Sequence, residues 1–599
     1  MALDDAISPF RDARYAPLSL SVERRDDGSL ILANTAAFDT PFPTMAQPLD
    51  HWAASAPDRT WLAERQGPSV PGWRTLSYAD GAERVARLAA GLRELGLGPG
   101  APLLILARNG IDHAVAAYAA LRIGCPIAPV SPQYGQPGAD PARLAYAVSL
   151  IAPYAAFTED AEEFGEALIG CEGLFGRPLI AARNAQGRML DMAALEAGRR
   201  VPISARRDDV AKLLLTSGST GKPKSGVQTH ANLADNSAQI AACFNDPEPP
   251  VLVNSAPWSH SLGANSILHA TLHRGGTLYI DHGQPTPARF GETLRNLSEV
   301  ATTYCNMVPA GWQLLIDPLE TDAELAAMFF SRLRLMQYGG AGLPQSVAYR
   351  VQAVAVRTTG ERISFGAGYG STETGPTLCN VPYLNSRAGL CGLPVPGTTL
   401  KLSPAPGGKM ECMGRGPQIS PGYRTADGAV TPLPLEDEGF YGLGDAVRLL
   451  DEARPELGLV FDGRLVENFK LATGAFVAAG PLRLAALSAL GGLASEAVVC
   501  GENEAGVGLM LFLNVGAAEG LDDAARRLRV RQGLASMNAS AAGVGGRIAR
   551  ALILDGAPDA ASGELSDKGS LNQALARSRR PTELGRLYAE RPDGGVIVL

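Results

Sequence analysis

A stretch of small, hydroxyl-bearing and basic residues, TSGSTGKPKSG at positions 216–226, has the composition of a phosphate-binding loop. Glycines let a phosphate approach the backbone, hydroxyl and backbone N–H groups donate hydrogen bonds, and a lysine neutralises charge. The spacing excludes a Walker loop, because only two residues separate Gly218 from Gly221 and Pro223 follows Lys222. The stretch therefore predicts a phosphate site of another type, and the alternative is a surface turn after a strand.

Lysines are scarce in this chain, so each one near such a stretch is a candidate for chemistry. Lysine is a compact point charge on a flexible stem, whereas arginine is a rigid fork, and the two are not equivalent in a site. A skewed base composition of the coding sequence would also explain the scarcity. The lysines are residues 212, 222, 224, 401, 409, 470 and 568.

The elements that must position these residues alternate between helix and strand from about residue 75. Residues 78–96 (YADGAERVARLAAGLRELG) and 112–124 have helical spacing of apolar residues, and 101–108 (APLLILAR) and 125–130 are short buried strands. This rhythm predicts a parallel sheet covered by helices. It recurs at KLLLTSG, TLYIDHG and LRLMQYGG, where apolar runs end in glycine-rich loops, which is where α/β folds bind ligands.

The residue composition and the pattern of apolar positions change after about residue 390. Residues 391–424 are rich in Gly and Pro with short alternating segments, which predicts a small antiparallel or barrel-like subdomain. From about residue 464 helices and strands alternate again. We therefore expect an α/β protein with a large N-terminal domain, residues 1–463, and a small C-terminal domain, residues 464–599.

Composition and charge exclude several classes of function. The net charge is −8 without a block of like charges, so we expect neither nucleic acid nor an anionic membrane as a partner. No apolar run is long enough to span a bilayer, and the first residues lack the pattern of a secretory signal. Eight scattered cysteines without a C-x-x-C pair predict reduced, mostly buried thiols in a cytoplasmic protein, and neither Cys nor His spacing predicts a metal cage.

Six segments in order resemble the motifs of the adenylate-forming superfamily of acyl-CoA synthetases, luciferases and peptide-synthetase adenylation domains. They are LLLTSGSTGKPKSGVQTHANL, APWSHSLGAN, LMQYGGAGLP, GYGSTETGP, YGLGDAVRL and FDGRLVENFKLATG. Ser225 and Leu443 depart from the usual glycine and threonine. The resemblance implies αβαβα subdomains with parallel sheets, a small barrel-like subdomain and a mobile C-terminal α+β domain.

The resemblance also implies a site for ATP and Mg²⁺. Tyr369 would stack on adenine, Thr372 would contact the α-phosphate, and Asp445 with Arg464 would bind the ribose. Glu373 and Thr220 would hold the metal ion. The full ATP-binding set is Thr216, Ser217, Gly218, Ser219, Thr220, Gly221, Lys224, Gly340, Ala341, Gly342, Tyr369, Gly370, Asp445 and Arg464.

The resemblance further implies that the remaining substrates are a carboxylic acid and coenzyme A. His260 would be the histidine of the carboxylate pocket and would take part in catalysis, and the expected acid-binding set is Trp258, His260, Asn306, Gly340, Gly366, Ala367 and Gly368. CoA contacts would come from Lys470, Thr473 and Gly474, after a hinge at Val466 where relatives usually carry Asp or Lys. Lys568, in SGELSDKGSLNQ, would be the catalytic lysine that bridges the acid and the α-phosphate.

The segments HWAASAPDRTWLAER, GCPIAPVSPQY, FDGRLVENFKLATGAFVAAGPLR and GELSDKGSLNQ most resemble long-form feruloyl-CoA synthases. This implies an AMP-forming acid:CoA ligase for a hydroxycinnamate-type acid, and a homodimer is left open. Two alternatives remain. One is a stand-alone adenylation enzyme that acts on benzoate or a fatty acid or loads a carrier protein, and the other is a nucleotide-binding pseudoenzyme.

Overall fold

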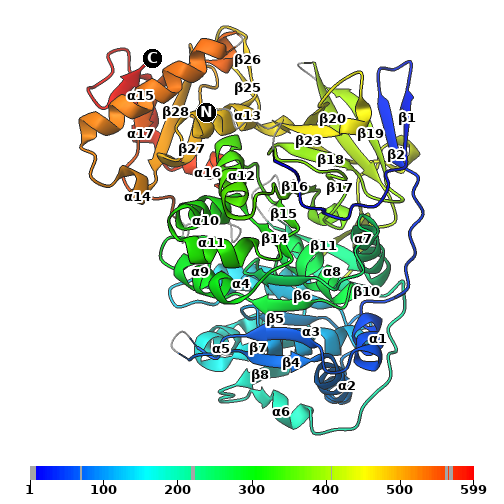
Figure 1. Cartoon of the computed structure of the whole chain (residues 1–599). Coiled ribbons are helices and arrows are strands. Elements are labelled where there is room, and N and C mark those ends of the chain that lie inside the picture. Colours follow the sequence, from blue (N-terminus) through cyan, green and yellow to red (C-terminus); the bar gives the residue numbers. More distant parts are fainter. Residues whose placement is uncertain are drawn as a thin grey trace.

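The computed structural model describes residues 8–67, 70–216, 223–405, 408–541, 543–559, 564–565 and 571–599. Figure 1 shows a large body, coloured from blue to yellow, and a smaller lobe of orange and red elements at one end. The predicted phosphate-binding residues 217–222 and Lys568 lie outside the described residues, as does the side chain of Val466.

A nine-stranded sheet forms one layer of the body, with the order β22-β21-β11-β10-β6-β5-β7-β8-β9. Its parallel strands include β5 (Leu103–Leu106), β6 (Ile127–Val130), β7 (Ala155–Asp160) and β8 (Leu179–Arg183), connected through helices such as α3 (Ile111–Arg122), α4 (Pro141–Ile151) and α5 (Ala161–Gly170). Helix α2 (Tyr78–Glu94) precedes β5. These elements confirm the helix-and-strand rhythm read from residues 78–130.

The predicted phosphate-binding stretch connects two antiparallel strands. β10 (Val210–Thr216) pairs in parallel with β6 but antiparallel with β11 (Lys224–Thr229), so that Thr216 lies opposite Lys224. β11 continues to β21 (Gly422–Arg424) and β22 (Val430–Pro432). The stretch therefore follows a strand, as expected. It leads into β11, an antiparallel strand that the alternation of helices and strands in the sequence did not predict.

An eleven-stranded sheet carries most of the other predicted motifs. Its parallel part is β14 (Tyr304–Met307), β15 (Leu335–Tyr338) and β16 (Ser364–Tyr369). It continues through antiparallel strands β17 (Cys379–Asn380), β18 (Leu390–Pro394), β24 (Leu459–Arg464), β23 (Tyr441–Leu449), β20 (Lys409–Arg415) and β19 (Thr399–Ala405). The Gly- and Pro-rich region is thus antiparallel, as predicted. An N-terminal hairpin, β1 (Leu20–Arg24) with β2 (Leu30–Asn34), completes the sheet beside β19.

A four-stranded sheet, in the order β12-β13-β3-β4, lies in the same body. Its strands are β12 (Val251–Asn254), β13 (Thr277–Ile280), β3 (Thr60–Glu64) and β4 (Arg74–Ser77). Between β12 and β13 the chain forms a π-helix, η3 (Leu262–His269), and the short α8 (Ala270–His273). π-Helical segments occur frequently at functional sites.

The C-terminal lobe has its own sheet, β27 (Ala494–Cys500), β28 (Val507–Leu513), β29 (Ile548–Ile553) and β30 (Val596–Val598). Helices α13 (Ala479–Ala489), α15 (Asp523–Ser540), α16 (Gln573–Ser578) and α17 (Pro581–Tyr588) pack on it (Figure 1). A Cβ added to Gly342 of the large body would lie 2.4 Å from Leu484 of α13, so the lobe contacts the loop after β15. The exact boundary predicted after residue 463 stays a prediction.

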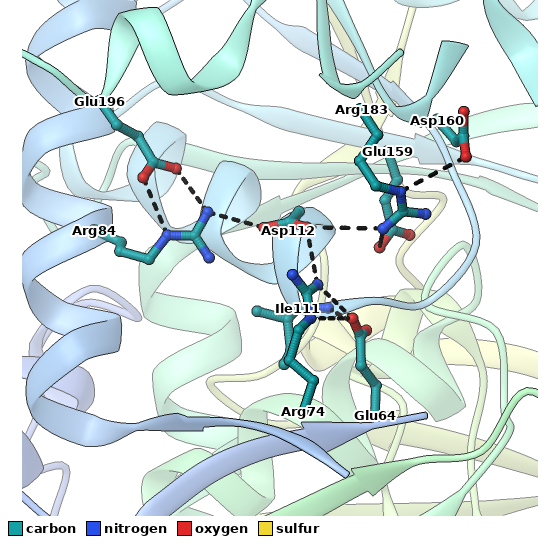
Figure 2. A network of polar contacts seen from close by, with 9 residues as sticks. All are labelled: Glu64, Arg74, Arg84, Ile111, Asp112, Glu159, Asp160, Arg183 and Glu196. Carbon is teal, nitrogen blue, oxygen red and sulfur yellow. Dashed lines mark hydrogen bonds and ion pairs between the residues drawn. The ribbon is translucent and has the colours of Figure 1, made fainter. Parts of the chain in front are cut away.

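A cluster of ion pairs, called the ion cluster below, connects the four-stranded and nine-stranded sheets (Figure 2). Asp112, at the start of α3, accepts hydrogen bonds of 2.9 Å from both Arg74 and Arg84. Glu64 accepts the backbone N–H of Ile111 at 2.8 Å and pairs with Arg74. Burial alone would raise the pKa of Asp112, but the two guanidinium groups outweigh burial and hold that pKa below its ordinary value.

All eight cysteines are buried and unpaired, which confirms the reading of scattered thiols. Among the described residues no helix is long and apolar enough to cross a membrane. In the same part of the chain no group of three or more His, Cys, Asp or Glu side chains converges on a metal-sized site.

Candidate active site

A short 3-10 turn, η4 (Thr372–Thr374), follows β16 and carries two of the predicted catalytic residues. Glu373 is buried, and the hydroxyl of Tyr423 donates to its Oε1 at 2.8 Å. The ammonium group of Lys224 lies 4.9 Å from the centre of the Tyr423 ring, within the range of a cation–π contact. Lys224, Tyr423 and Glu373 therefore form one row from the hairpin to the turn.

Thr372 faces the same hairpin and the start of η3. Its hydroxyl lies 3.3 Å from that of Ser261, and a Cβ added to Gly226 of β11 would lie 3.6 Å from its methyl group. The predicted α-phosphate ligand thus lies beside the strand that leaves the phosphate-binding stretch. Phosphate, metal and acid could meet at this point of the fold.

The predicted ribose site is formed by paired strands. Asp445 on β23 lies opposite Arg464 on β24, with 3.5 Å between Oδ1 and Nε, and Tyr369 donates to Asp445 Oδ2 at 3.0 Å. Asp445 is buried, and its Oδ1 accepts no hydrogen bond from any described residue. Burial raises the pKa of Asp445 to about 6, against the opposing effects of Arg464 and Tyr369. A buried acceptor without a donor suits a ribose hydroxyl, which would supply one.

The residues present also fit a magnesium ion. Glu373 offers a carboxylate oxygen, the ligand that Mg²⁺ prefers, and Mg²⁺ is commonly held by one or two carboxylates together with phosphate oxygens rather than by an all-protein cage. The second predicted metal ligand, Thr220, lies outside the described residues.

A cavity of about 140 Å³ begins at this turn and extends into the body. Near the turn it is lined by Gly339, Gly340, Gly368 and Thr372. One face of η3 and α8 forms a wall, with lining residues at spacings of four, namely Leu262, Ser266 and Ala270, followed by Arg274. The charged side chains of Asp246 and Arg334 also line the cavity.

The opposite wall of this cavity is a hydrogen-bonded chain of polar side chains. Asn306 Nδ2 donates to the hydroxyl of Tyr304 at 3.1 Å, and Tyr304 in turn donates to Gln337. Gln337 Nε2 donates to Asn380 Oδ1 at 2.9 Å. These side chains present polar groups to a largely enclosed space, as sites for small molecules commonly do.

Of the predicted acid-binding residues, Asn306, Gly340 and Gly368 line the cavity. Trp258 is 3% exposed and packs edge-to-face on His113, with ring centres 5.0 Å apart, in the core rather than in the cavity wall. His260 lies at the start of a helical turn, and its carbonyl accepts the backbone N–H of Ala264 at 2.9 Å. Gly366 and Ala367 lie on β16 and do not line the cavity.

The remaining nucleotide residues lie in the loops after β15 and β16. Gly340 adopts φ +84°, which favours glycine. Ala341 and Gly342 continue this loop toward α13, and Gly370 connects β16 to η4.

A second cavity shares Leu262 and Asn306 with the first and is also lined by Arg108, His282 and Leu565. Leu565 belongs to the C-terminal part of the chain and precedes the predicted catalytic Lys568 by three positions. Leu565 therefore lies against the large body, and the cavity that it lines adjoins the first cavity, which reaches η4.

The predicted CoA residues lie apart from both cavities. Lys470 ends β25 (Phe469–Lys470), and Thr473 and Gly474 form the exposed turn to β26 (Phe476–Val477). Gly474 has φ +81° and nothing within 4 Å of an added Cβ, so this turn is open to a ligand.

Sequence reasoning missed several residues of the site. The cavity wall includes Tyr304, Gln337, Asn380 and Arg274. Polar residues in otherwise buried strands, as in TYCNM and LMQY, were a usable signal. Tyr423 lies in the Gly- and Pro-rich region, 50 residues after Glu373, and no local pattern connects the two.

The chain is similar to several characterised proteins. Residues 49–424 match the family described as AMP-binding enzyme. The chain is 28% identical to a feruloyl-CoA synthase of Amycolatopsis sp over 387 residues, which are 62% of this chain and 71% of that protein. It is 27% identical to a long-chain-fatty-acid–CoA ligase of Yersinia pestis over 413 residues, 62% of this chain and 69% of that protein.

Its fold is similar to a crystal structure of an anthranilate CoA ligase in complex with anthranoyl-AMP, with a TM-score of 0.73 and 15% identity over 90% of this chain and 98% of that one. This likeness confirms the predicted architecture of a large α/β body with a small C-terminal domain.

Proposed function

Because the chain belongs to the AMP-binding enzyme family, we propose that it is an AMP-forming acid:CoA ligase for an aromatic acid of the hydroxycinnamate type. The observation that carries this proposal is the position of η4. Thr372 lines the cavity, and Glu373 is connected through Tyr423 to Lys224 of the phosphate-binding hairpin. One turn thus adjoins an acid-sized cavity and a phosphate-binding strand.

The first half-reaction joins the acid to AMP. A carboxylate oxygen attacks the α-phosphorus of ATP, a new C(O)–O–P bond forms, and the bond to the β-phosphate oxygen breaks to release pyrophosphate. Thr372 donates to the α-phosphate, and Lys568 offsets the repulsion between the two anions. Asp445 accepts from the ribose and holds the nucleotide in line. Bound magnesium would neutralise charge on the phosphate oxygens.

The second half-reaction transfers the acyl group. The thiolate of CoA attacks the acyl carbonyl, a thioester forms, and AMP leaves with the electron pair of the broken C–O bond. The exposed turn at Thr473 and Gly474 offers backbone groups to the pantetheine arm. Motion of the C-terminal domain about Val466 would withdraw Lys568 and admit this arm.

The hydroxycinnamate assignment rests on the cavity and on sequence resemblance. Gly340 and Gly368 line the cavity without side chains and leave room for a planar group. Asn306 also lines the cavity, and its buried Oδ1 accepts no hydrogen bond from any described residue. A hydroxyl on an aromatic acid would supply that hydrogen bond, whereas a saturated fatty chain would leave this oxygen unpaired, which costs affinity.

The test is AMP release by the wild-type protein with ATP, Mg²⁺ and a panel of cinnamic, benzoic and fatty acids, with and without CoA. We expect CoA thioesters of hydroxycinnamates and AMP in equal amounts. A preference for fatty acids would overturn the substrate class only. Acid-dependent AMP release that is indifferent to CoA would favour the adenylation enzyme that loads a carrier protein.

The role of Lys568 separates the two half-reactions. Lys568→Ala should abolish adenylate formation, measured as exchange of pyrophosphate into ATP, yet leave thioester formation from supplied acyl-adenylate largely intact. Loss of both half-reactions to the same extent would contradict the assignment of this lysine.

A further inference from the structure

A buried lysine lies four residues before the phosphate-binding stretch, outside the set of residues assigned above. Lys212 on β10 is 1% exposed, and among the described residues no carboxylate lies within ion-pair distance of its amine. Its two polar neighbours are Asn265 Oδ1 at 2.7 Å and His269 Nε2 at 2.6 Å, both on η3. Burying a lysine without a counter-charge is costly, so the hydrogen bonds of its amine are the place to look for a role.

The hydrogen bonds from Asn265 lead to the catalytic turn. Asn265 Nδ2 donates to the carbonyl of Gly375 at 2.8 Å and to Gln228 Oε1 at 3.1 Å. Gln228, which lies opposite Lys212 across the β10–β11 pair, donates from Nε2 to the carbonyl of Thr372 at 3.0 Å. The carbonyls at both ends of the turn Thr372–Gly375 are therefore held by one network.

The direction of these bonds is fixed from the turn outward. A backbone carbonyl can only accept, so the amide nitrogens of Gln228 and Asn265 must face the turn, and Asn265 Oδ1 must face Lys212. Lys212 then donates to Asn265. By donating to Asn265 Oδ1, the amine of Lys212 therefore favours the amide orientation that the turn requires.

The network extends away from the turn to a second buried residue. His269 Nδ1 lies 2.6 Å from the hydroxyl of Tyr118, which is 1% exposed. Burial lowers the pKa of Lys212 well below its ordinary value, and it also lowers the pKa of His269. When the amine of Lys212 and the ring of His269 are both uncharged, each hydrogen bond has one donor. Tyr118 donates to His269, His269 donates to Lys212, and Lys212 donates to Asn265.

We propose that Lys212 is a positioning residue for adenylate formation, which fixes the turn Thr372–Gly375 through Asn265 and Gln228. This inference rests on the proposed function. Since a displacement of about 1 Å at reacting groups can cost about 100-fold in rate, a loosened turn should slow the chemistry even where the fold survives. Leu262, Ser266 and Ala270, on another face of η3, line the acid cavity, so we expect acid binding to be affected less than the position of the turn.

The first experiment compares Lys212→Met with the wild type. Methionine has a similar length but cannot donate to Asn265. We expect the kcat of pyrophosphate exchange to fall about 10- to 100-fold, while the KM for the acid changes less than about twofold. Thioester formation from supplied acyl-adenylate should fall far less. An exchange rate within twofold of the wild type in folded Lys212→Met would overturn the proposal.

A matched pair of tyrosines separates positioning from loss of packing. Tyr118 and Tyr78 are both buried, both pack against Trp61, and each makes one hydrogen bond, but Tyr78 donates to the carbonyl of Gly276, outside the network. Tyr118→Phe should lower the kcat of exchange about 2- to 5-fold, whereas Tyr78→Phe should leave it unchanged. Equal losses in the two variants would overturn the proposal, and this comparison remains available should Lys212→Met fail to fold.

Amide hydrogen exchange gives a readout that needs no catalysis. In Lys212→Met or Tyr118→Phe, the amides of residues 371–377 should exchange faster than in the wild type, and in Tyr78→Phe they should not. Unchanged protection of these amides in both network variants would overturn the proposal. Absence of acid-dependent pyrophosphate exchange in the wild type would instead contradict the proposed function, and hydrogen exchange would still decide the role of Lys212.

Discussion

The ion cluster and the Lys212 network bury ionisable groups in different ways. In the ion cluster, Asp112 is 8% exposed at its side chain and is compensated by Arg74 and Arg84, whose side chains are 37% and 29% exposed (Figure 2). In the Lys212 network, an amine with no carboxylate partner among the described residues is surrounded by amides and an imidazole.

The two arrangements also end differently. The ion cluster closes on itself at the start of α3 and connects two sheets, so its charges are satisfied whether or not a ligand is bound. The Lys212 network ends on two carbonyls of a catalytic turn. We infer that compensated charges maintain the fold, whereas directed hydrogen bonds set the position of reacting groups.

The largest expected effect is on the catalytic side of this comparison. Glu373→Gln removes the carboxylate that would hold the metal ion, so the rate of pyrophosphate exchange should fall about 100- to 1,000-fold. The unfolding free energy should change little, because Tyr423 can still donate to the amide oxygen. Glu64→Gln, the same change in the ion cluster, serves as the control, and its rate per folded molecule should equal that of the wild type.

The next effect is on the fold. Asp112→Asn leaves Arg74 and Arg84 without their shared carboxylate, so the unfolding free energy in urea should fall by about 1–3 kcal/mol, less than for a fully buried pair because both guanidinium groups reach solvent. The exchange rate per folded molecule should not change. Asp523→Asn, in an exposed pair with Arg527, should cost less than about 0.5 kcal/mol. A cost for Asp112→Asn as small as that would contradict a structural role for the cluster.

The two regions should also differ in their response to pH. The pKa of Asp445 is raised to about 6, so its carboxylate loses the charge that accepts from the ribose as the pH falls through 6, and the KM for ATP should rise several-fold. Asp445→Asn should have a high KM at every pH between 5 and 7. The pKa of Asp112 is lowered in the folded protein. Its contribution to stability is therefore fully present at a pH above the ordinary pKa of a carboxyl, and it is lost as the pH falls through the lowered pKa. A KM for ATP that is flat from pH 5 to 7 in the wild type would exclude the role of Asp445.

The smallest effect concerns Glu159, at the edge of the ion cluster. Burial, together with the nearby Glu64, raises its pKa well above the ordinary value, so folding favours the protonated form. The stability from this group is therefore fully present at low pH and is lost as the pH rises toward the raised pKa. Glu159→Gln resembles the neutral form and should raise the unfolding free energy at pH 8 by up to about 1 kcal/mol. A loss of stability at pH 8 would show that Arg183 keeps this carboxylate ionised.

Much of the fold follows from local patterns, because helices and parallel strands of the body carry their own periodicity. Residues 78–130 show this best. The pairing of β2 with β19 could not be predicted, since it joins segments about 370 positions apart through backbone hydrogen bonds that leave no mark in composition. The antiparallel pairing of β10 with β11 was missed because β11, KSGVQT, has no apolar run that would mark it as a strand.

Some residues of the site could likewise be predicted from sequence motifs, and others could not. The motif residues Tyr369, at the end of β16, and Asp445, within β23, meet through a side-chain hydrogen bond, although β17, β18 and β24 lie between their strands in the sheet. Trp258, within the motif APWSHSLGAN, was expected in the acid-binding set, but its ring packs in the core next to His113. Lys212 was noticed only as a scarce residue type, since the burial and the partners that give it a role come from η3, about 50 positions later.

Measuring the pyrophosphate exchange rate and the unfolding free energy together for Lys212→Met and Asp112→Asn separates a network that positions the chemistry from one that maintains the fold. Lys212→Met should lose at least about 10-fold in exchange rate per folded molecule, and Asp112→Asn should lose none. Asp112→Asn should also lose more stability than Lys212→Met. The same loss of rate per folded molecule in both variants would contradict this difference between the two networks.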